Sequence, residues 1–147
     1  MKLSTKGQYG ARAMLDLALH YGEGPVLLKD IAKRQQISER YLEHLMVSLK
    51  AAGLIRSMRG ARGGFTLAGP PSQIRLSEII EAMEGSVVLV ECVDAPDVCS
   101  RADHCVTRDI WAEMNKAMGD VLDSTTLADL AQRQREKEKS EAVMYYI

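Results

Sequence analysis

Residues 28–53 read LKDIAKRQQISERYLEHLMVSLKAAG, and this stretch decides the fold. Its first eight residues predict a short helix with Ile31 and Ala32 on the buried side, and a brief turn then leads to Ser38. Serine is a good N-cap because its hydroxyl accepts a hydrogen bond from a backbone N–H of the first helical turn. A helix, a short turn and a second, capped helix form the helix-turn-helix arrangement.

The helix that follows Ser38 is expected to present a polar face outward. Its apolar residues recur at the i, i+3, i+4, i+7 spacing of one buried stripe, which consists of Leu42, Leu45, Met46 and Leu49. The opposite face carries Arg40, Glu43, His44 and Lys50. In a helix-turn-helix protein the first two turns of such a helix contact base edges in the major groove. We therefore expect Arg40, Glu43 and His44 to bind DNA.

A β-hairpin is expected directly after this helix. Two strand-like runs, 54–58 and 65–68, flank the basic, glycine-rich segment RGARGG at residues 59–64. Glycines permit close backbone approach to a surface, and the charges of Arg59 and Arg62 suit phosphates or a narrow minor groove. A hairpin in this place is a wing, and the alternative is a surface hairpin with incidental arginines. Residues 1–70 are thus predicted to form a winged helix-turn-helix domain.

Composition favours a mainly α protein whose first half meets a polyanion. Only 5% of the 147 residues are aromatic, which suits helices packed with aliphatic side chains. Residues 1–70 hold 11 Lys and Arg against 5 Asp and Glu, whereas residues 71–147 hold 8 against 15. This asymmetry points to DNA as the partner of the basic half, the alternative being two ordinary solvated surfaces.

The chain has no apolar run near the ~20 residues of a membrane span, and no signal-peptide core follows Met1. We expect a cytoplasmic protein without membrane contact, and cysteines that are reduced.

The second half is predicted to begin with the linker 69–72 and a short helix, residues 78–84, capped by Ser77. Residues 87–101 lack helical periodicity and should form a loop. A long helix over 107–122 carries an apolar stripe formed by Ile110, Trp111, Met114, Met118, Val121 and Leu122. This stripe is wider than a small domain requires, so we expect it to form a dimer interface, with a role in the protomer's own core as the alternative.

The remaining helices begin at recognisable caps. Ser4 is expected to cap the first helix, whose buried stripe includes Tyr9, Ala13, Leu17 and Tyr21. Thr126 and Asp129 resemble a capping box at the start of a short last helix. Residues 71–131 would then hold the cysteine loop and the dimerisation helix, and residues 132–147 a charged, flexible tail.

Three cysteines lie within fourteen residues, in the order Cys92, Cys99 and Cys105. Thiolates so spaced on a loop can converge on one metal centre, and the spacing is wider than the paired cysteines of structural zinc sites. An iron–sulfur cluster is therefore favoured over zinc, with a fourth ligand still to be supplied. The alternative is three free cysteines that behave as small apolar residues.

Three segments carry a resemblance to a known family: MKLSTKGQY at residues 1–9, ISERYLE at 37–43 and RGARGGF at 59–65. Through them nearly the whole chain resembles the winged helix-turn-helix regulators that include the cluster regulator IscR, the nitric-oxide sensor NsrR and the cysteine-metabolism repressor CymR. The resemblance implies a homodimer with a long C-terminal dimerisation helix that binds palindromic operators in double-stranded DNA. It also implies that Arg40, Glu43 and His44 read bases and that Arg59 enters the minor groove.

The resemblance further implies that Cys92, Cys99 and Cys105 hold the cluster of the IscR and NsrR branches, [2Fe–2S] in preference to [4Fe–4S]. IscR has a histidine ligand three residues after the third cysteine, where this chain has Arg108. NsrR-like proteins use an aspartate at the position that Gln8 holds here. The fourth ligand therefore stays open. The implied function is a regulator, mostly a repressor, that senses iron–sulfur, redox or nitric-oxide status.

The C-terminal residues resemble the CymR branch instead, in VLDSTTLADL at 121–130 and MYYI at 144–147. This resemblance implies an alternative function, a repressor of sulfur metabolism controlled by a cysteine synthase or by thiol oxidation. The synthase would bind Tyr146 and Ile147, because its active site takes peptides with a terminal isoleucine. Nothing predicts an enzyme, since no phosphate-binding loop occurs and no Cys–His pair has a third group to orient it.

Overall fold

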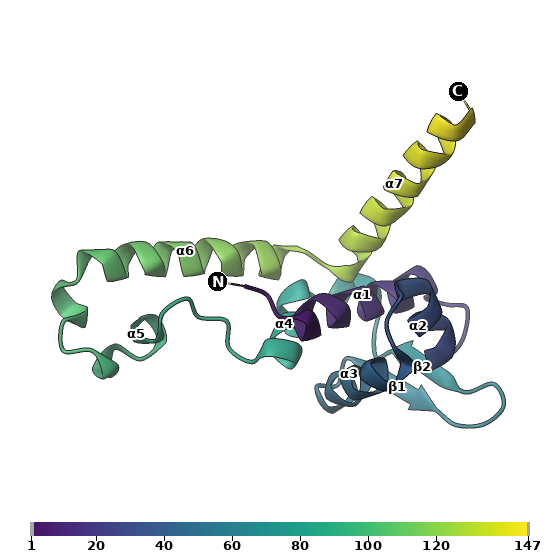
Figure 1. Ribbon diagram of the computed structural model, residues 1–147, viewed down its shortest axis with the longest axis horizontal. Helices are drawn as coiled ribbons and strands as arrows, with labels where there is room; N and C mark the ends of the chain where they lie inside the picture. The colour runs from purple at the N-terminus through teal and green to yellow at the C-terminus, as the bar shows by residue number, and fades with distance from the viewer. Residues whose placement is uncertain (1, 147) are drawn as a thin grey trace.

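The computed structural model describes residues 2–146 of the chain, with the side chain of Tyr146 excepted. A compact body holds four helices and a two-stranded hairpin: α1 (Thr5–Leu19), α2 (Leu28–Gln35), α3 (Glu39–Ala51), β1 (Ile55–Met58), β2 (Gly64–Leu67) and α4 (Leu76–Glu84). The second half adds α5 (Glu91–Asp94), α6 (Val106–Ser124) and α7 (Leu127–Tyr146), with 3₁₀ turns at Pro71–Gln73, Pro96–Val98 and Ala102–His104. Helix α6 and the end of α7 project away from the body in different directions (Figure 1).

The first helix begins as its sequence predicts. The hydroxyl of Ser4 accepts a hydrogen bond from the Gly7 N–H at 3.3 Å, so Ser4 is the N-cap of α1. Ala13 and Leu17 are buried and Tyr9 is half-buried. Tyr21 is 53% exposed, and its expected place in the buried stripe is wrong because α1 ends at Leu19 before another turn can form.

The helix-turn-helix is confirmed, with the Ser38 cap at its second helix. The Ser38 hydroxyl accepts from the Tyr41 N–H at 3.1 Å, which starts α3 at the predicted residue. Gly53, with φ of +76°, follows the end of α3, and the Leu54 N–H reaches back to the Leu49 carbonyl. This is a Schellman motif, in which a left-handed glycine satisfies the last helical carbonyls.

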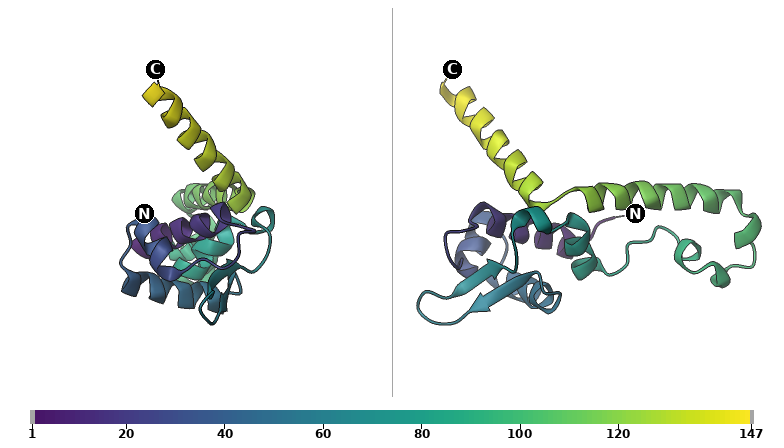
Figure 2. Two further views of the ribbon diagram at one scale, coloured as in Figure 1. Left: turned by 90° about the vertical axis from the view of Figure 1, so that its right-hand side faces the viewer. Right: turned by 180° about the vertical axis from the view of Figure 1, so that it is seen from behind.

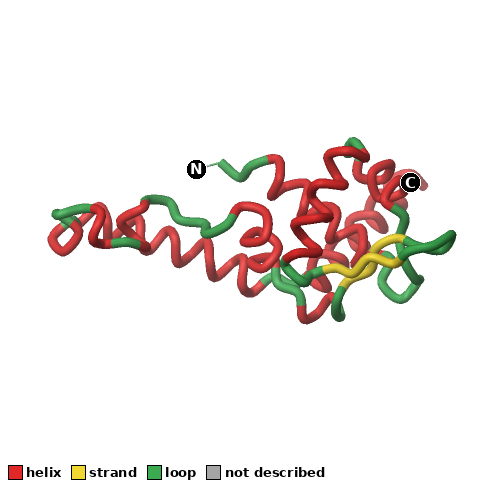
Figure 3. The backbone as a smooth tube through the Cα atoms, turned by 90° about the horizontal axis from the view of Figure 1, so that it is seen from below, coloured by secondary structure: helices red, strands yellow, loops and turns green. Residues whose placement is uncertain are grey.

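The hairpin is antiparallel, with Ile55 opposite Leu67 and Met58 opposite Gly64. A third backbone segment supports it, because Val26 and Phe65 exchange hydrogen bonds of 2.9 and 2.8 Å. Figure 3 shows the hairpin loop extending beyond the helices at the edge of the body. The wing is thus attached both to the end of α3 and to the segment that precedes α2.

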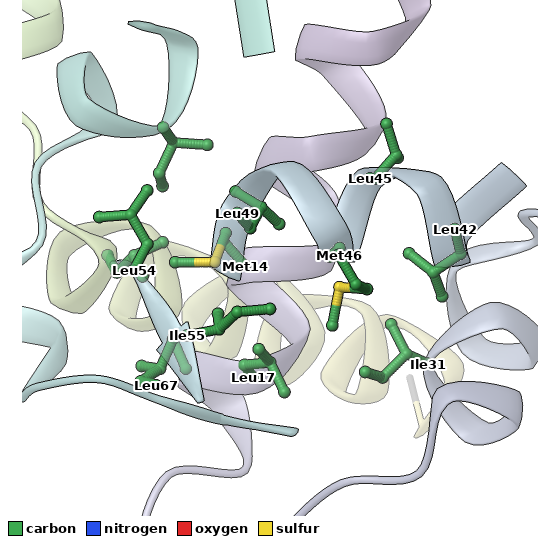
Figure 4. Close-up of a cluster of buried hydrophobic side chains, with 14 of the residues drawn as sticks. Met14, Leu17, Ile31, Leu42, Leu45, Met46, Leu49, Leu54, Ile55 and Leu67 are labelled. Atoms are coloured by element: carbon green, nitrogen blue, oxygen red, sulfur yellow. The ribbon is translucent and has the colours of Figure 1, made fainter. Parts of the chain in front are cut away.

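One hydrophobic core joins both halves of the chain. Figure 4 shows side chains of α1, α2, α3 and the hairpin meeting around Met14, Leu17 and Met46. The same buried cluster continues past the 69–72 linker into α4 and α7, through Ile74, Ile79, Met83, Leu127 and Ala131. The boundary that we expected near residue 70 therefore does not separate two hydrophobic cores.

Helix α4 starts earlier than predicted. It begins at Leu76, and the Arg75 N–H donates to the Glu78 carboxylate at 2.8 Å, so the expectation that Ser77 caps this helix is wrong. The backbone before Ser77 is fixed instead by hydrogen bonds to the start of α7, from the Leu76 N–H to the Thr125 carbonyl and back from Leu127 to Ile74. Gly85 ends α4 with φ of +77°.

The last helix is longer than the sequence suggested. Thr126 and Asp129 form the predicted capping box, with reciprocal hydrogen bonds of 2.9 and 3.1 Å. The expected short helix is wrong in length, because α7 continues through the charged segment to Tyr146. Two i, i+4 pairs, Gln132 with Glu136 and Gln134 with Glu138, support it on its exposed side. In Figure 2, α7 leaves the body over most of its length.

Candidate nucleic-acid interface and cysteine loop

The outward face of α3 is the first element of the candidate interface. Arg40, Glu43 and His44 are all exposed there, where the helical period places them. Leu42 and Leu45 on the opposite face are buried to 1% exposure or less, so the rotation of α3 about its axis is fixed by the core. The three polar side chains are thereby held in solvent on a rigid helix.

Two features of this face were not predicted from the sequence. Val47, one turn beyond Glu43, is 65% exposed, although an apolar residue at this position is easily taken for core. Lys50 lies further along, and its Nζ donates to the Ser57 hydroxyl of β1 at 2.7 Å. The Lys50 ammonium thus ties the end of α3 to the wing, and the helical period alone gives no sign of that contact.

The wing arginines lie at the hairpin loop. Arg59 and Arg62 are exposed, and neither makes a salt bridge within the part of the chain that the structure describes. A turn closed by the Gly63 N–H and the Gly60 carbonyl, 2.9 Å apart, holds the loop. Helix α3 and the hairpin both lie on the lower side of the body in Figure 1, away from α6 and α7. The two elements that carry the predicted DNA-contacting residues thus lie on one side of the molecule.

An ion pair between a buried carboxylate, Asp16, and a partly exposed guanidinium, Arg34, fixes α2 against α1. Asp16 is 1% exposed, and its carboxylate accepts two hydrogen bonds from the Arg34 guanidinium at 2.8 and 2.9 Å and one from the Gln35 amide at 3.0 Å. The hydrogen bond to Asp16 raises the pKa of Arg34 above its ordinary value. Because α2 supports α3, this pair helps to set the angle at which α3 is presented.

The three cysteines occupy one excursion between α4 and α6. Cys92 lies in α5, Cys99 follows the Pro96–Val98 turn, and Cys105 directly precedes α6. All three are half-buried free thiols. Among residues 2–146, no three His, Cys, Asp or Glu side chains lie close enough together to hold a metal ion. The donor set thus suits an iron–sulfur cluster in chemistry and in chain position, but its side chains are not gathered into a finished site.

Hydrogen bonds to α6 hold this excursion in place. Arg108 donates from Nε to the Cys92 carbonyl at 2.9 Å, and the Asn115 side chain accepts from the Leu89 N–H at 3.1 Å. The Cys105 sulfur lies 3.1 Å from the Thr107 hydroxyl. This contact, aided by the backbone N–H of Arg108, lowers the pKa of Cys105 below the ordinary thiol value. The hydrogen bond from Arg108 to the Cys92 carbonyl therefore holds the cysteine loop against α6.

The predicted dimer stripe lies on the projecting helix α6, none of whose residues is buried. Ile110, Trp111, Met114 and Val121 are 38 to 62% exposed, while Met118 and Leu122 are half-buried. Met114 and Met118 line a groove of about 510 Å³ together with Lys2 and Leu3. Most of the stripe is thus available for contact.

The other predicted contacts lie at the C-terminus. Ile147 and the side chain of Tyr146 are outside the described residues, and the preceding Val143, Met144 and Tyr145 are exposed. Within residues 2–146, none of the helices combines the length and the hydropathy needed to traverse a bilayer.

This fold and its exposed face define a winged helix-turn-helix protein, mainly helical with one antiparallel hairpin. The model of the Rrf2 family, described as an iron-dependent transcriptional regulator, matches residues 3–133. The chain belongs to the Rrf2 family of DNA-binding transcriptional regulators, which confirms the family resemblance seen in its sequence.

The similar proteins include regulators named CymR and regulators named IscR. The chain is 42% identical to the regulator CymR of Bacillus subtilis over 100% of both chains. It is similar to the solved structure of that global cysteine regulator, with a TM-score of 0.78, 43% identity, and coverage of 90% of this chain and 98% of the other. It is equally similar to IscR of T. potens, with a TM-score of 0.77, 45% identity, and coverage of 93% and 90%.

Proposed function

We propose that this chain is a homodimeric repressor that binds a palindromic operator through α3 and the wing. Arg40, Glu43 and His44 would contact base edges in the major groove, while Arg59 and Arg62 would contact phosphates or the minor groove. The observation that carries the proposal is that both sets of polar side chains are exposed, on α3 and on the hairpin, two elements that lie on one side of the body, with α3 fixed by its buried face.

The DNA-binding assignment is tested with an operator selected in vitro by the full-length chain. Arg59→Ala should weaken binding to all sequences and reduce the dependence of log Kd on log salt by about one phosphate contact. Arg40→Ala and His44→Ala should instead change which operator variants are preferred. Equal losses on every sequence for all three variants would contradict this division of roles.

We further propose that the cysteine loop is the sensing element and that Cys92, Cys99 and Cys105 hold an iron–sulfur cluster, [2Fe–2S] in preference to [4Fe–4S]. A bound cluster would supply a centre that responds to redox state or nitric oxide. Arg108, at the position of the IscR histidine, cannot ligate iron while its guanidinium is protonated. Its bond to the Cys92 carbonyl instead positions the loop against α6, so the fourth ligand comes from another residue, the partner subunit or solvent.

The cluster is tested by anaerobic reconstitution of the full chain, with quantification of iron and sulfide and an absorption spectrum. The wild type should become coloured with stoichiometric iron, whereas Cys92→Ala should bind little. Arg108→Ala should still bind iron if Arg108 only braces the loop. A wild type that stays colourless and iron-free after reconstitution would refute the proposal that the three cysteines hold a cluster.

A second candidate function is a CymR-like repressor of sulfur metabolism controlled by a cysteine synthase or by thiol oxidation. It is favoured by the full-length match to CymR and by α7, which continues as an exposed helix toward the C-terminus. A synthase partner would bind Tyr146 and Ile147. The affinity of the synthase for this chain should fall sharply when residues 144–147 are deleted. An unchanged affinity for the truncated chain would rule out binding of the synthase through the C-terminus.

A further inference from the structure

Val47 completes the outward face of α3. It lies three residues after His44, four after Glu43 and seven after Arg40, the spacing of neighbours on one side of an α-helix. Its side chain is 65% exposed, whereas the other large aliphatic side chains of α3 are exposed by 1% or less. The proposed base-contacting face therefore contains one apolar side chain among polar ones.

The surroundings of Val47 suit nucleic acid better than an apolar protein partner. Arg40 and His44 precede it on the same face, and Lys50 follows it and bonds the wing at Ser57. A protein docking surface needs a contiguous apolar patch, and Val47 is instead a single apolar side chain among polar and charged ones, Glu43, His44 and Lys50. Along α3 it lies between His44 and Lys50, the residue that bonds the hairpin.

The major groove offers an apolar side chain one characteristic partner. Of the four bases, only thymine presents a methyl group there, at C5, and the other base edges present hydrogen-bond donors and acceptors. A valine held against the groove gains from burying its methyl groups on the thymine methyl and gains nothing from a polar edge.

We infer that Val47 is a specificity-determining residue that selects a thymine through contact with its C5 methyl group, once in each half-site of the operator. The inference rests on the proposed function, because it requires α3 in the major groove. It adds to that function an apolar contact that is independent of the hydrogen bonds made by Arg40, Glu43 and His44.

The test replaces thymine by uracil, which lacks only the C5 methyl group. An operator selected in vitro with the full-length chain is synthesised with each dT changed singly to dU, and Kd is measured by fluorescence anisotropy. The wild type should lose about fourfold in affinity at one thymine per half-site, the value expected for one buried methyl group. Val47→Ala should bind the dT and dU forms of that site equally.

Val143→Ala is the matched control, because Val143 is a similarly exposed valine, 58%, on α7. It should keep the full discrimination between dT and dU. A wild type that is indifferent to dU at every position, or a Val47→Ala variant that discriminates as the wild type does, would overturn the inference and leave the DNA-binding proposal intact. If the in vitro selection enriches no operator, both the inference about Val47 and the DNA-binding proposal are refuted.

Discussion

At the scale of single residues, the Asp16–Arg34 pair makes a clear prediction. Asp16 is buried and accepts three hydrogen bonds, while Arg34 remains 39% exposed and can be partly hydrated when its partner is lost. Asp16→Ala should therefore lower the free energy of unfolding by about 2–3 kcal/mol, measured by urea denaturation. Asp120→Ala, which breaks an exposed pair with Lys116, is the control and should leave stability unchanged. Equal effects of the two variants would refute the role given to Asp16.

Gly64 is the second residue whose substitution should be costly. Its φ is +142°, and a Cβ there would collide with the backbone carbonyl of Val26, which supports the wing. Gly64→Ala should destabilise the protein by about 1–3 kcal/mol and weaken operator binding through a displaced hairpin. In Gly69→Ala the new methyl meets open space, so thermal unfolding and DNA affinity should both match the wild type.

At the scale of elements, the start of α7 should be sensitive to acid. The Asp129 carboxylate accepts from the backbone N–H of Thr126 at 2.9 Å, which lowers the pKa of Asp129 below its ordinary value. A carboxyl whose pKa is depressed on folding contributes stability above its unfolded pKa, and this contribution is lost as the pH falls through the folded pKa. The stability difference between wild type and Asp129→Asn should thus shrink as the pH falls below the unfolded pKa of Asp129 and through its lowered folded pKa. A difference that is constant over this range would contradict the cap.

At the scale of the whole molecule, the projecting helix α6 should govern assembly. The side chains of Ile110 and Trp111 remain 47% and 38% exposed in the protomer. Sedimentation equilibrium should give the wild type twice the chain mass of 16.3 kDa, and Trp111→Glu should shift it toward the single chain. The variant should also lose affinity for a palindrome more than for an isolated half-site. Val143→Glu, on α7, should remain a dimer, and a monomeric wild type would refute this assembly.

Whether a structural feature could be predicted from the sequence depended on how far apart in the chain its interacting residues lie. Ser4 and Ser38 act within a few residues of the helix ends that they define, and both were predicted. The prediction that Ser77 caps α4 was wrong because the start of this helix is set by the Arg75–Thr126 bridge, whose partners are fifty-one residues apart. The helical period predicted the exposed polar face of α3. It did not predict the exposure of Val47, since the period alone does not say how much of the helix surface other elements cover.

The winged helix-turn-helix of residues 28–68 was determined by the sequence itself, because its caps, helical stripes and glycine turn are local signals. The three clustered cysteines are likewise a property of the sequence. Only the tertiary structure decided that Val26 supports the wing, that Asp16 is buried beside Arg34, and that one core extends into α4 and α7. It also decided that Arg108 braces the Cys92 segment. These contacts join segments distant in the chain, and their formation depends on packing that no local pattern encodes.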